Sequence, residues 1–238
     1  MKIAIVGYGK MGKTIEKIAR DRGHEISFAV DHGEADKLLQ ISKENTNVAI
    51  EFTQPEAAYE NIKHLISNKV PVVSGTTGWL DKKPAIEELC QQKDGTFFYA
   101  SNFSIGVNIF FKLNEYLANM MSNFNEYDVK MEEIHHTEKK DAPSGTAITL
   151  AEGILSQIKG KKQWINEVSA SAELLPIASK RIDKVPGTHT VNYYSLVDDI
   201  EIKHTAHSRE GFAKGAVVVA EWLQDKKGVL SMNDFMKI

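Results

Sequence analysis

Short apolar segments alternate with amphipathic ones through the first hundred residues. Five apolar runs have the length of buried strands, at 2–6, 25–30, 47–52, 70–74 and 96–100. Segments with helical spacing separate them, among them 55–68, which begins with a proline, and 82–93. Strands that alternate with helices in this way predict an α/β domain, a parallel sheet with helices on both faces.

The pattern changes after residue 105. A long helix to residue 121 and a helix from residue 146 to about 160 are predicted, together with alternating, β-rich stretches at 127–134, 177–184, 188–197 and 200–206. Residues 213–223 are helical again and are expected to return to the first domain. We therefore expect a dinucleotide-type domain at 1–104 and 212–238, and a second α+β domain with a mixed or antiparallel sheet at 105–211.

A glycine turn, Gly7-Tyr8-Gly9-Lys10-Met11-Gly12, follows the first predicted strand, and the second strand ends in Asp31. In a dinucleotide-binding unit the first glycine permits a tight turn and the second lets the backbone approach a pyrophosphate. The third lets the helix pack on the strand, while the acid accepts hydrogen bonds from the ribose. This order predicts a Rossmann-type domain that binds NADH and/or NADPH, although the same glycines could form a turn in another α/β domain.

The residue after the acid bears on the choice of dinucleotide. His32 follows Asp31, where an arginine could meet the 2′-phosphate of NADPH. This arrangement favours NADH, but His32 and Lys10 leave NADPH open.

Two further loops follow predicted strands and are expected at the same edge of the sheet, where ligands of such sheets bind. They are Gly75-Thr76-Thr77-Gly78 and Ala100-Ser101-Asn102-Phe103-Ser104. The first loop combines glycines that allow close backbone approach with two hydroxyls that can donate hydrogen bonds to a ribose or a nicotinamide amide. By itself it could also be an ordinary tight turn.

A segment rich in chemistry lies in the second domain, from Glu133 to Thr146. His135 and His136 belong to the residue type that titrates near neutrality, and Lys139 and Lys140 add positive charge. The sequence Ser144-Gly145-Thr146 then opens a helix, whose first backbone N–H groups favour anions. The combination predicts a site for a small carboxylated substrate.

Each of these residues also has a simpler interpretation. Adjacent residues of a strand face opposite sides, so the two histidines do not readily chelate one ion, and no suitably spaced cysteine supports zinc; we expect no metal. The two lysines could be an exposed loop pair. Ser144 is expected to be an N-cap, and Thr146 could be structural.

Composition narrows the class of protein. The chain of 238 residues has a formal net charge of −3, which argues against nucleic-acid binding as its main task. No apolar run approaches the ~20 residues that span a bilayer. With a single cysteine, Cys90, and no export signal, the cytoplasm is the expected compartment.

The chain resembles the 4-hydroxy-tetrahydrodipicolinate reductase family (dihydrodipicolinate reductases) of lysine and diaminopimelate biosynthesis. The resemblance rests on the segment from Glu133 to Ala147 and on four other blocks: Gly75-Thr-Thr-Gly78, Asn102-Phe-Ser-Ile-Gly106, His204-Thr-Ala-His-Ser-Arg209 and Phe212-Ala-Lys-Gly-Ala216. It departs from the family in the glycine turn, which in many members is closer to GxxGxMG, and at His32, where arginine is frequent.

The resemblance implies a role for each matching residue. His135 would be the general acid–base residue and Lys139 its partner and proton donor, while the substrate carboxylates would be held by His136, Gly145, Thr146 and Arg209. The cofactor would contact the glycine turn, Asp31, Gly75 to Thr77 and Ala100 to Phe103. The substrate would be a small cyclic dicarboxylate, the second domain would also carry oligomerisation, and the family usually forms homotetramers. Two rival functions are a different Rossmann reductase and a non-catalytic NAD(P)-sensing module.

Overall fold

A computed structural model describes residues 1–167, 169, 171–208 and 210–237. The chain divides into two units, and each is described by itself. The first unit consists of Met1–Ile105 and Glu210–Ile238, and the second of Gly106–Arg209.

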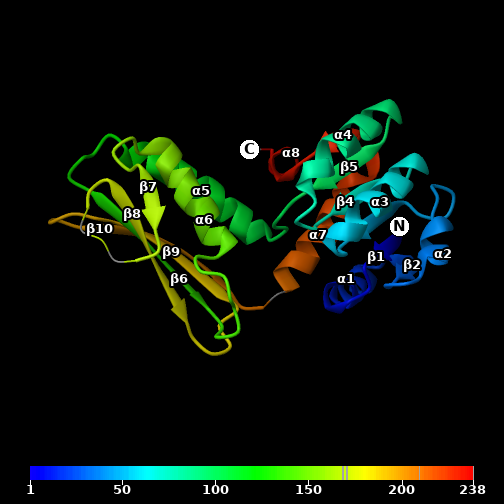
Figure 1. Cartoon of the computed structure of the whole chain (residues 1–238), viewed down its shortest axis with the longest axis horizontal. Coiled ribbons are helices and arrows are strands. Elements are labelled where there is room, and N and C mark those ends of the chain that lie inside the picture. Colours follow the sequence, from blue (N-terminus) through cyan, green and yellow to red (C-terminus); the bar gives the residue numbers. More distant parts are fainter. Residues whose placement is uncertain (168, 170, 209, 238) are drawn as a thin grey trace. The chain divides into compact units, whose positions relative to one another are not determined.

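A parallel sheet of six strands lies at the centre of the first unit, in the order β11-β5-β4-β3-β1-β2. Figure 1 labels β1, β2, β4 and β5 of this sheet. Its strands are β1 (Lys2–Val6), β2 (Glu25–Val30), β3 (Val48–Glu51), β4 (Val72–Ser74), β5 (Thr96–Tyr99) and β11 (Gly228–Leu230). The helices are α1 (Lys10–Asp21), α2 (Ala35–Leu39), α3 (Pro55–Ser67), α4 (Lys83–Gln92), α7 (Glu210–Trp222) and α8 (Met232–Met236), with 3₁₀ turns η1 (Leu80–Lys82) and η2 (Leu223–Asp225).

The alternation of side chains along each strand divides the core of this unit between the two faces of the sheet. Ile5 of β1 packs in one buried cluster with apolar residues of α1, α7 and α8. Its neighbour Val6 belongs to a second cluster with residues of α3 and α4, including Cys90. Helices therefore cover both faces, and the predicted doubly wound α/β architecture is confirmed.

A mixed sheet forms the second unit, in the order β10-β9-β6-β8-β7. Strand β9 runs antiparallel to both β10 and β6, whereas β8 runs parallel to both β6 and β7. The elements are α5 (Ile105–Met121), β6 (Asp128–His135), α6 (Gly145–Gln157), β7 (Gln163–Ile165), β8 (Leu174–Arg181), β9 (Gly187–Tyr194) and β10 (Asp199–Ala206). The expected α+β domain with a mixed sheet is confirmed.

Helices α5 and α6 lie together on one face of this sheet (Figure 1). Leu117 of α5 and Leu150 of α6 share a buried cluster with Met131 of β6 and Val191 of β9. The buried amide of Asn114 donates to the carbonyl of Leu150 at 2.9 Å and joins the two helices. The sheet and the two helices thus give β6 a firm support, and the histidine segment leaves from the end of that strand.

The sequence pattern missed the shortest elements. Strands β7 and β11 have three residues each and helices α2 and α8 have five, so none of them completes enough of a period to be recognised. Strand β11 matters most, because it pairs with β5 and completes one edge of the parallel sheet. Among the described residues, no helix combines the length and the apolar character needed to cross a bilayer.

Candidate active site

The glycine turn after β1 has the shape that its sequence predicted. Gly7 has a φ of +101°, and a Cβ there would lie 2.0 Å from the carbonyl oxygen of Phe52. A Cβ at Gly12 would lie 2.3 Å from the carbonyl oxygen of Gly7, so only glycine lets α1 pack this closely. A Cβ at Gly9 would meet nothing within 4 Å. The first and third glycines are therefore structural, while the second leaves open space beside the start of a helix.

A cavity of about 470 Å³ adjoins this turn. Gly7, Tyr8 and Gly9 line it together with Asp31, and so does the turn that follows β2, His32-Gly33-Glu34. The backbone N–H of Asp31 donates to the carboxylate of Glu34 at 2.9 Å, which holds the two acids on the same short turn. A dinucleotide fits this arrangement, since it offers a helix start for phosphates and carboxylates for ribose hydroxyls.

The other expected cofactor residues lie outside the lining of this cavity. Lys10, Met11 and Gly12 form the first turn of α1. Gly75, Thr76 and Thr77 follow β4, and Ala100, Ser101, Asn102 and Phe103 follow β5, so both loops leave the carboxyl ends of parallel strands as expected. The side chain of Phe103 is buried in the core of the unit, which leaves only its backbone for a ligand.

A buried acid organises the loop after β4. Glu51, at the end of β3, is fully buried and accepts hydrogen bonds from the hydroxyls of Ser74 at 2.7 Å and Thr76 at 2.8 Å. It also accepts one from the backbone N–H of Thr53 at 3.1 Å. Burial raises the pKa of Glu51, and these hydrogen bonds oppose the rise. The hydroxyl of Thr76 is thus committed to Glu51, which corrects the expectation that it donates to a cofactor.

In the second unit, β6 ends at His135, so the chain turns away before His136. His135 is buried with 8% of its surface exposed, whereas His136 is half-buried. The alternation of a strand would send these side chains to opposite faces, but His136 already belongs to the following turn, where its carbonyl accepts from the backbone N–H of Lys139 at 3.1 Å.

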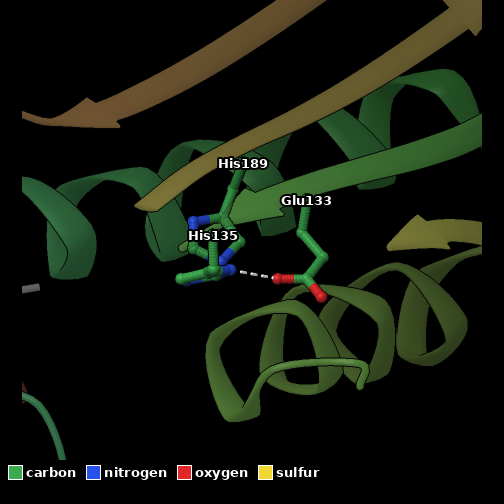
Figure 2. A group of neighbouring side chains, drawn as sticks. All are labelled: Glu133, His135 and His189. Atoms are coloured by element: carbon green, nitrogen blue, oxygen red, sulfur yellow. Dashed lines mark ion pairs between the residues drawn. The ribbon is translucent and has the colours of Figure 1, made fainter. Parts of the chain in front are cut away.

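Three buried side chains meet at the end of β6: Glu133, His135 and His189 (Figure 2). The carboxylate of Glu133, which is fully buried, forms an ion pair with Nδ1 of His135. The rings of His135 and His189 meet edge to face, with centroids 5.1 Å apart. On its other side His189 contacts the hydroxyl of Ser144 through Nε2 at 3.1 Å.

The charges of this cluster are set by its partners. Burial raises the pKa of Glu133, but the contacts of His135, Ser179 and Arg181 lower it by more, to about 2. Burial lowers the pKa of His189 to about 4, and the neighbouring His135 adds to the effect. Glu133 is therefore an anion at neutral pH, and His189 is uncharged.

Arg181, at the end of β8, ties Glu133 to the loop that carries Lys139. Its Nη1 lies 2.9 Å from the carboxylate of Glu133, and its Nη2 donates to the carbonyl of Asp141 at 2.6 Å. The ammonium of Lys139 lies 2.8 Å from both carboxylate oxygens of Asp141. Lys139 is therefore half-buried within a charge network and is not the solvated loop residue of the simpler interpretation.

Helix α6 starts beside this network. The side chain of Ser144 accepts from the backbone N–H of Ala147 at 3.2 Å, which confirms its expected role as N-cap. Gly145 is exposed and Thr146 half-buried, both in the first turn of the helix. The remaining expected substrate residue, Arg209, lies outside the described residues.

The cluster of Glu133, His135 and His189 offers three ligand atoms within 4.8 Å of one another, which is the one arrangement among the described residues with the composition of a metal site. Both oxygens of its carboxylate are already paired, with His135 and with Arg181. A divalent cation would have to break these pairs and lie beside a guanidinium, so the chemistry of the group favours an acid–base cluster over a metal centre.

Sequence reasoning missed Glu133, Arg181 and His189 as members of the site. The pairing of the strands brings them together: Glu133 is the partner of His189 across β6 and β9, and His135 is the partner of Arg181 across β6 and β8. One signal was visible, because residues two apart on a strand share a face, and Glu133 precedes His135 by two. Arg181 and His189 join the site only through the register of β8 and β9 against β6, which the sequence pattern does not show.

Comparison with known proteins covers both units. Residues 1–103 match the family described as dihydrodipicolinate reductase, N-terminus, and residues 106–236 match dihydrodipicolinate reductase, C-terminus. The chain is 51% identical to a 4-hydroxy-tetrahydrodipicolinate reductase of Christiangramia forsetii, over 99% of this chain and 98% of the relative. It is 36% identical to the enzyme of the same name from Archaeoglobus fulgidus, over the whole of both chains. A solved structure of a dipicolinate-bound dihydrodipicolinate reductase from Paenisporosarcina has the same fold, with a TM-score of 0.79 at 21% identity over 99% of each chain.

Proposed function

The chain belongs to the dihydrodipicolinate reductase family, and from this premise we propose how its residues carry out the reduction of 4-hydroxy-tetrahydrodipicolinate in lysine and diaminopimelate biosynthesis. The reaction consumes NAD(P)H and a proton and yields tetrahydrodipicolinate, NAD(P)⁺ and water. The match of both halves of the chain to this one family is the observation that carries the assignment. It sets aside a different Rossmann reductase and a non-catalytic sensor.

The first unit is the dinucleotide-binding domain of this proposal. Its glycine turn and the start of α1 would hold the pyrophosphate, and Asp31 would accept hydrogen bonds from the adenosine ribose. The backbones of the loops Gly75 to Thr77 and Ala100 to Phe103 would extend the site along the sheet edge. The bound nicotinamide supplies the hydride.

NADH is the proposed preferred cofactor. The carboxylates of Asp31, Glu34 and Glu56 belong to residues that line the cavity, and the described lining includes His32 but neither lysine nor arginine. A 2′-phosphate brings up to two negative charges, and here it would meet acids on the turn that follows β2. The ammonium of Lys37, 2.5 Å from Glu34, offsets only part of this negative potential.

The ratio of kcat/KM for NADH to that for NADPH tests this preference, and we expect a ratio above one. Glu34→Gln keeps an acceptor for the N–H of Asp31 and removes one charge, so it should lower the ratio several-fold. Asp36→Asn removes the same charge from the exposed side of α2, outside the cavity lining, and should leave the ratio unchanged. A wild-type enzyme that favours NADPH would contradict the proposal.

In the second unit, His135 is the proposed general acid. Hydride addition to the ring of the substrate leaves electron density that a proton must neutralise, and an imidazole can deliver one near neutral pH. Lys139 would act beside it as a cation and proton donor. Its ammonium is now shared by the two oxygens of Asp141, so an arriving dicarboxylate would compete with Asp141 for it.

The substrate carboxylates would be held around the start of α6. The first backbone N–H groups of this helix, at Gly145 and Thr146, offer donors and the positive end of the helix dipole. His136 and Arg209 would add side-chain donors. A small cyclic dicarboxylate matches these groups in charge and in size.

The second unit is also the proposed site of self-association, as a homotetramer in the cytoplasm. Exposed large apolar side chains concentrate on it: all of those recorded except Leu39 and Leu80 belong to this unit, among them Leu196 and Val197 at the β9–β10 turn. Light scattering at several concentrations measures the mass, and a monomer throughout would contradict the tetramer.

The assay that tests the function couples this protein to a dihydrodipicolinate synthase and follows the oxidation of NADH and NADPH in separate reactions. We expect oxidation that depends on the synthase product. Dinucleotide binding without turnover of that product would overturn the proposed activity.

A further inference from the structure

The carboxylate of Glu133 is paired with Nδ1 of His135. We propose that Glu133 is the positioning residue of the active site, holding the imidazole of His135 by its Nδ1 so that Nε2 alone meets the substrate. This inference rests on the proposed role of His135. It gives a role to Glu133, which takes no part in the proposed reaction steps.

Burial and strand geometry make the pairing a fixed one. Glu133 and His135 lie two positions apart on β6, so both side chains project from the same face of the strand. The carboxylate is fully buried, and the side chain of His135 is 10% exposed. A buried carboxylate that accepts from Nδ1–H fixes both the tautomer and the orientation of a histidine ring.

The second carboxylate oxygen of Glu133 is held as well. Arg181 approaches it to 2.9 Å and reaches the loop behind it, donating to the carbonyls of Lys139 at 3.4 Å and Asp141 at 2.6 Å. With a cation on one oxygen and an imidazole on the other, the carboxylate cannot rotate away from His135 without breaking an ion pair. Arg181 thereby links the position of His135 to that of the Lys139 loop.

Nε2, on the other side of the ring, faces the backbone of β9 at Gly187. A Cβ at Gly187, the first residue of β9, would lie 3.0 Å from Nε2 of His135 and 3.3 Å from its Cδ2. Glycine at this position leaves the space beside Nε2 open. The imidazole is thus paired at one nitrogen, and the absence of a side chain at position 187 keeps the other nitrogen from being crowded from β9, which suits a proton-transferring histidine.

None of the other charged and titratable groups described around the ring of His135 could take the place of Glu133 as the partner of Nδ1. His189 approaches from β9 with an uncharged ring that is already in contact with Ser144. Lys139, in the loop after β6, pairs with Asp141. Glu133 is therefore the anion that can stabilise a protonated His135 during the proton transfer.

The first test compares Glu133→Gln with Glu132→Gln. The two residues are neighbours on β6, but Glu132 is more exposed and pairs with Lys180 on the other side of the strand. We expect Glu133→Gln to lower kcat by roughly ten- to a hundredfold, a share of the ~10²–10⁴-fold that general acid catalysis provides. The KM for NADH should stay within twofold, and Glu132→Gln should match the wild type. An unchanged kcat in folded Glu133→Gln would overturn the inference.

The second test reads the tautomer directly and needs no turnover. Long-range ¹H–¹⁵N spectra of the wild type, with His135→Gln used to assign the ring signals, show which nitrogen of neutral His135 carries the proton. We expect Nδ1–H in the wild type and a mixture of tautomers in Glu133→Ala. A wild-type ring protonated at Nε2 would overturn the inference even if no Glu133 variant folded.

The two tests separate this inference from the proposed function. Absence of reductase activity in the wild type would defeat the function, while the tautomer measurement would still decide the pairing. Full wild-type activity with an unaffected Glu133→Gln would defeat only the role of Glu133. Inhibition by Zn²⁺ that disappears in His189→Asn, with one Zn²⁺ bound per chain, would instead identify the cluster as a metal site and contradict the inference.

Discussion

The carboxylate of Glu133 and Nδ1 of His135 form a buried ion pair between residues two apart on one strand. Because β6 ends at His135, this pair lies where the sheet gives way to the loop of Lys139 and the start of α6. The strand provides rigidity, and the loop and the helix would provide donors for the dicarboxylate of the proposed reaction. From this arrangement we predict the effects of substitutions at the surrounding residues.

His135→Gln should lower kcat by on the order of 10²–10⁴-fold, because glutamine can hydrogen-bond but cannot transfer a proton. Dinucleotide affinity, measured by isothermal titration with NADH, should not change. His64→Gln, in α3 of the first unit, is a matched control and should leave kcat as it is. An equal loss of NADH binding in His135→Gln would count against the catalytic role.

Asp141→Asn should free the ammonium of Lys139, which now lies 2.8 Å from both oxygens of that carboxylate. Asp141 is exposed, and such pairs are worth at most about 1 kcal/mol, so we expect the KM for the substrate to fall by up to roughly fivefold. Steady-state kinetics measure this change, with Asp183→Asn in the exposed turn after β8 as control. A rise in KM would show that Asp141 assists substrate binding.

Gly187→Ala should reduce kcat and also lower stability, because the φ of +158° at this position is one that residues with a side chain rarely adopt. The added methyl would lie 3.0 Å from Nε2 of His135 and would crowd the proposed proton-transferring nitrogen. Gly160→Ala adds the same methyl where nothing lies within 4 Å, and its kcat should equal that of the wild type. Parallel measurement of kcat and thermal unfolding separates the two effects, and equal kcat in both variants would argue against an open space requirement at Nε2.

Gly9→Ala should weaken NADH binding while the fold is retained. A Cβ at Gly9 meets no protein atom within 4 Å, yet the residue lines the cavity, so the methyl would occupy space meant for the pyrophosphate. We expect the Kd for NADH to rise by roughly tenfold or more, which is about 1.4 kcal/mol. Gly7→Ala should instead destabilise the protein, because its Cβ would lie 2.0 Å from a carbonyl oxygen. Unchanged NADH binding by Gly9→Ala would remove this turn from the cofactor site.

His189 should make the protein less stable in mild acid. Burial is the main cause that lowers its pKa from 6.5 to about 4. Between pH 6.5 and pH 4, His189 is therefore protonated in the unfolded chain and uncharged in the folded chain. Stability is therefore lost as pH falls from about 6.5 to about 4, with a slope of at most ~1.4 kcal/mol per pH unit. Urea unfolding of the wild type and of His189→Asn across this range should show the free energy of unfolding of the wild type falling relative to that of the variant as pH falls. A constant difference would contradict the buried, neutral histidine.

Much of the fold could be predicted from local pattern. The periodicity of apolar residues predicted the bounds of β1, β2, α3 and α5 to within a residue or two. A strand or helix that buries one face carries apolar residues at a regular spacing, and this spacing is visible in the sequence. The shortest elements escaped, since three residues such as Gly228–Leu230 show no period and become a strand only by pairing with β5.

The loop after β4 shows where local reasoning about side chains stops. Thr76 and Thr77 lie between two glycines in this loop, so the hydroxyl of Thr76 was expected to donate to a ligand. It donates instead to Glu51, a buried acid at the end of the neighbouring strand β3. A buried carboxylate needs donors, and the strand ends that lie next to it supply them.

By itself, the sequence determined the order of the main elements, the glycine turn and the family, because all three are written in contiguous residues or in short periods. The tertiary structure decided which groups surround His135. Strand register sets Glu133 opposite His189 and His135 opposite Arg181, and register follows from the packing of whole strands against α5 and α6. A motif can therefore place an imidazole in the chain, while the partners that orient it come from strands that only the folded sheet brings alongside.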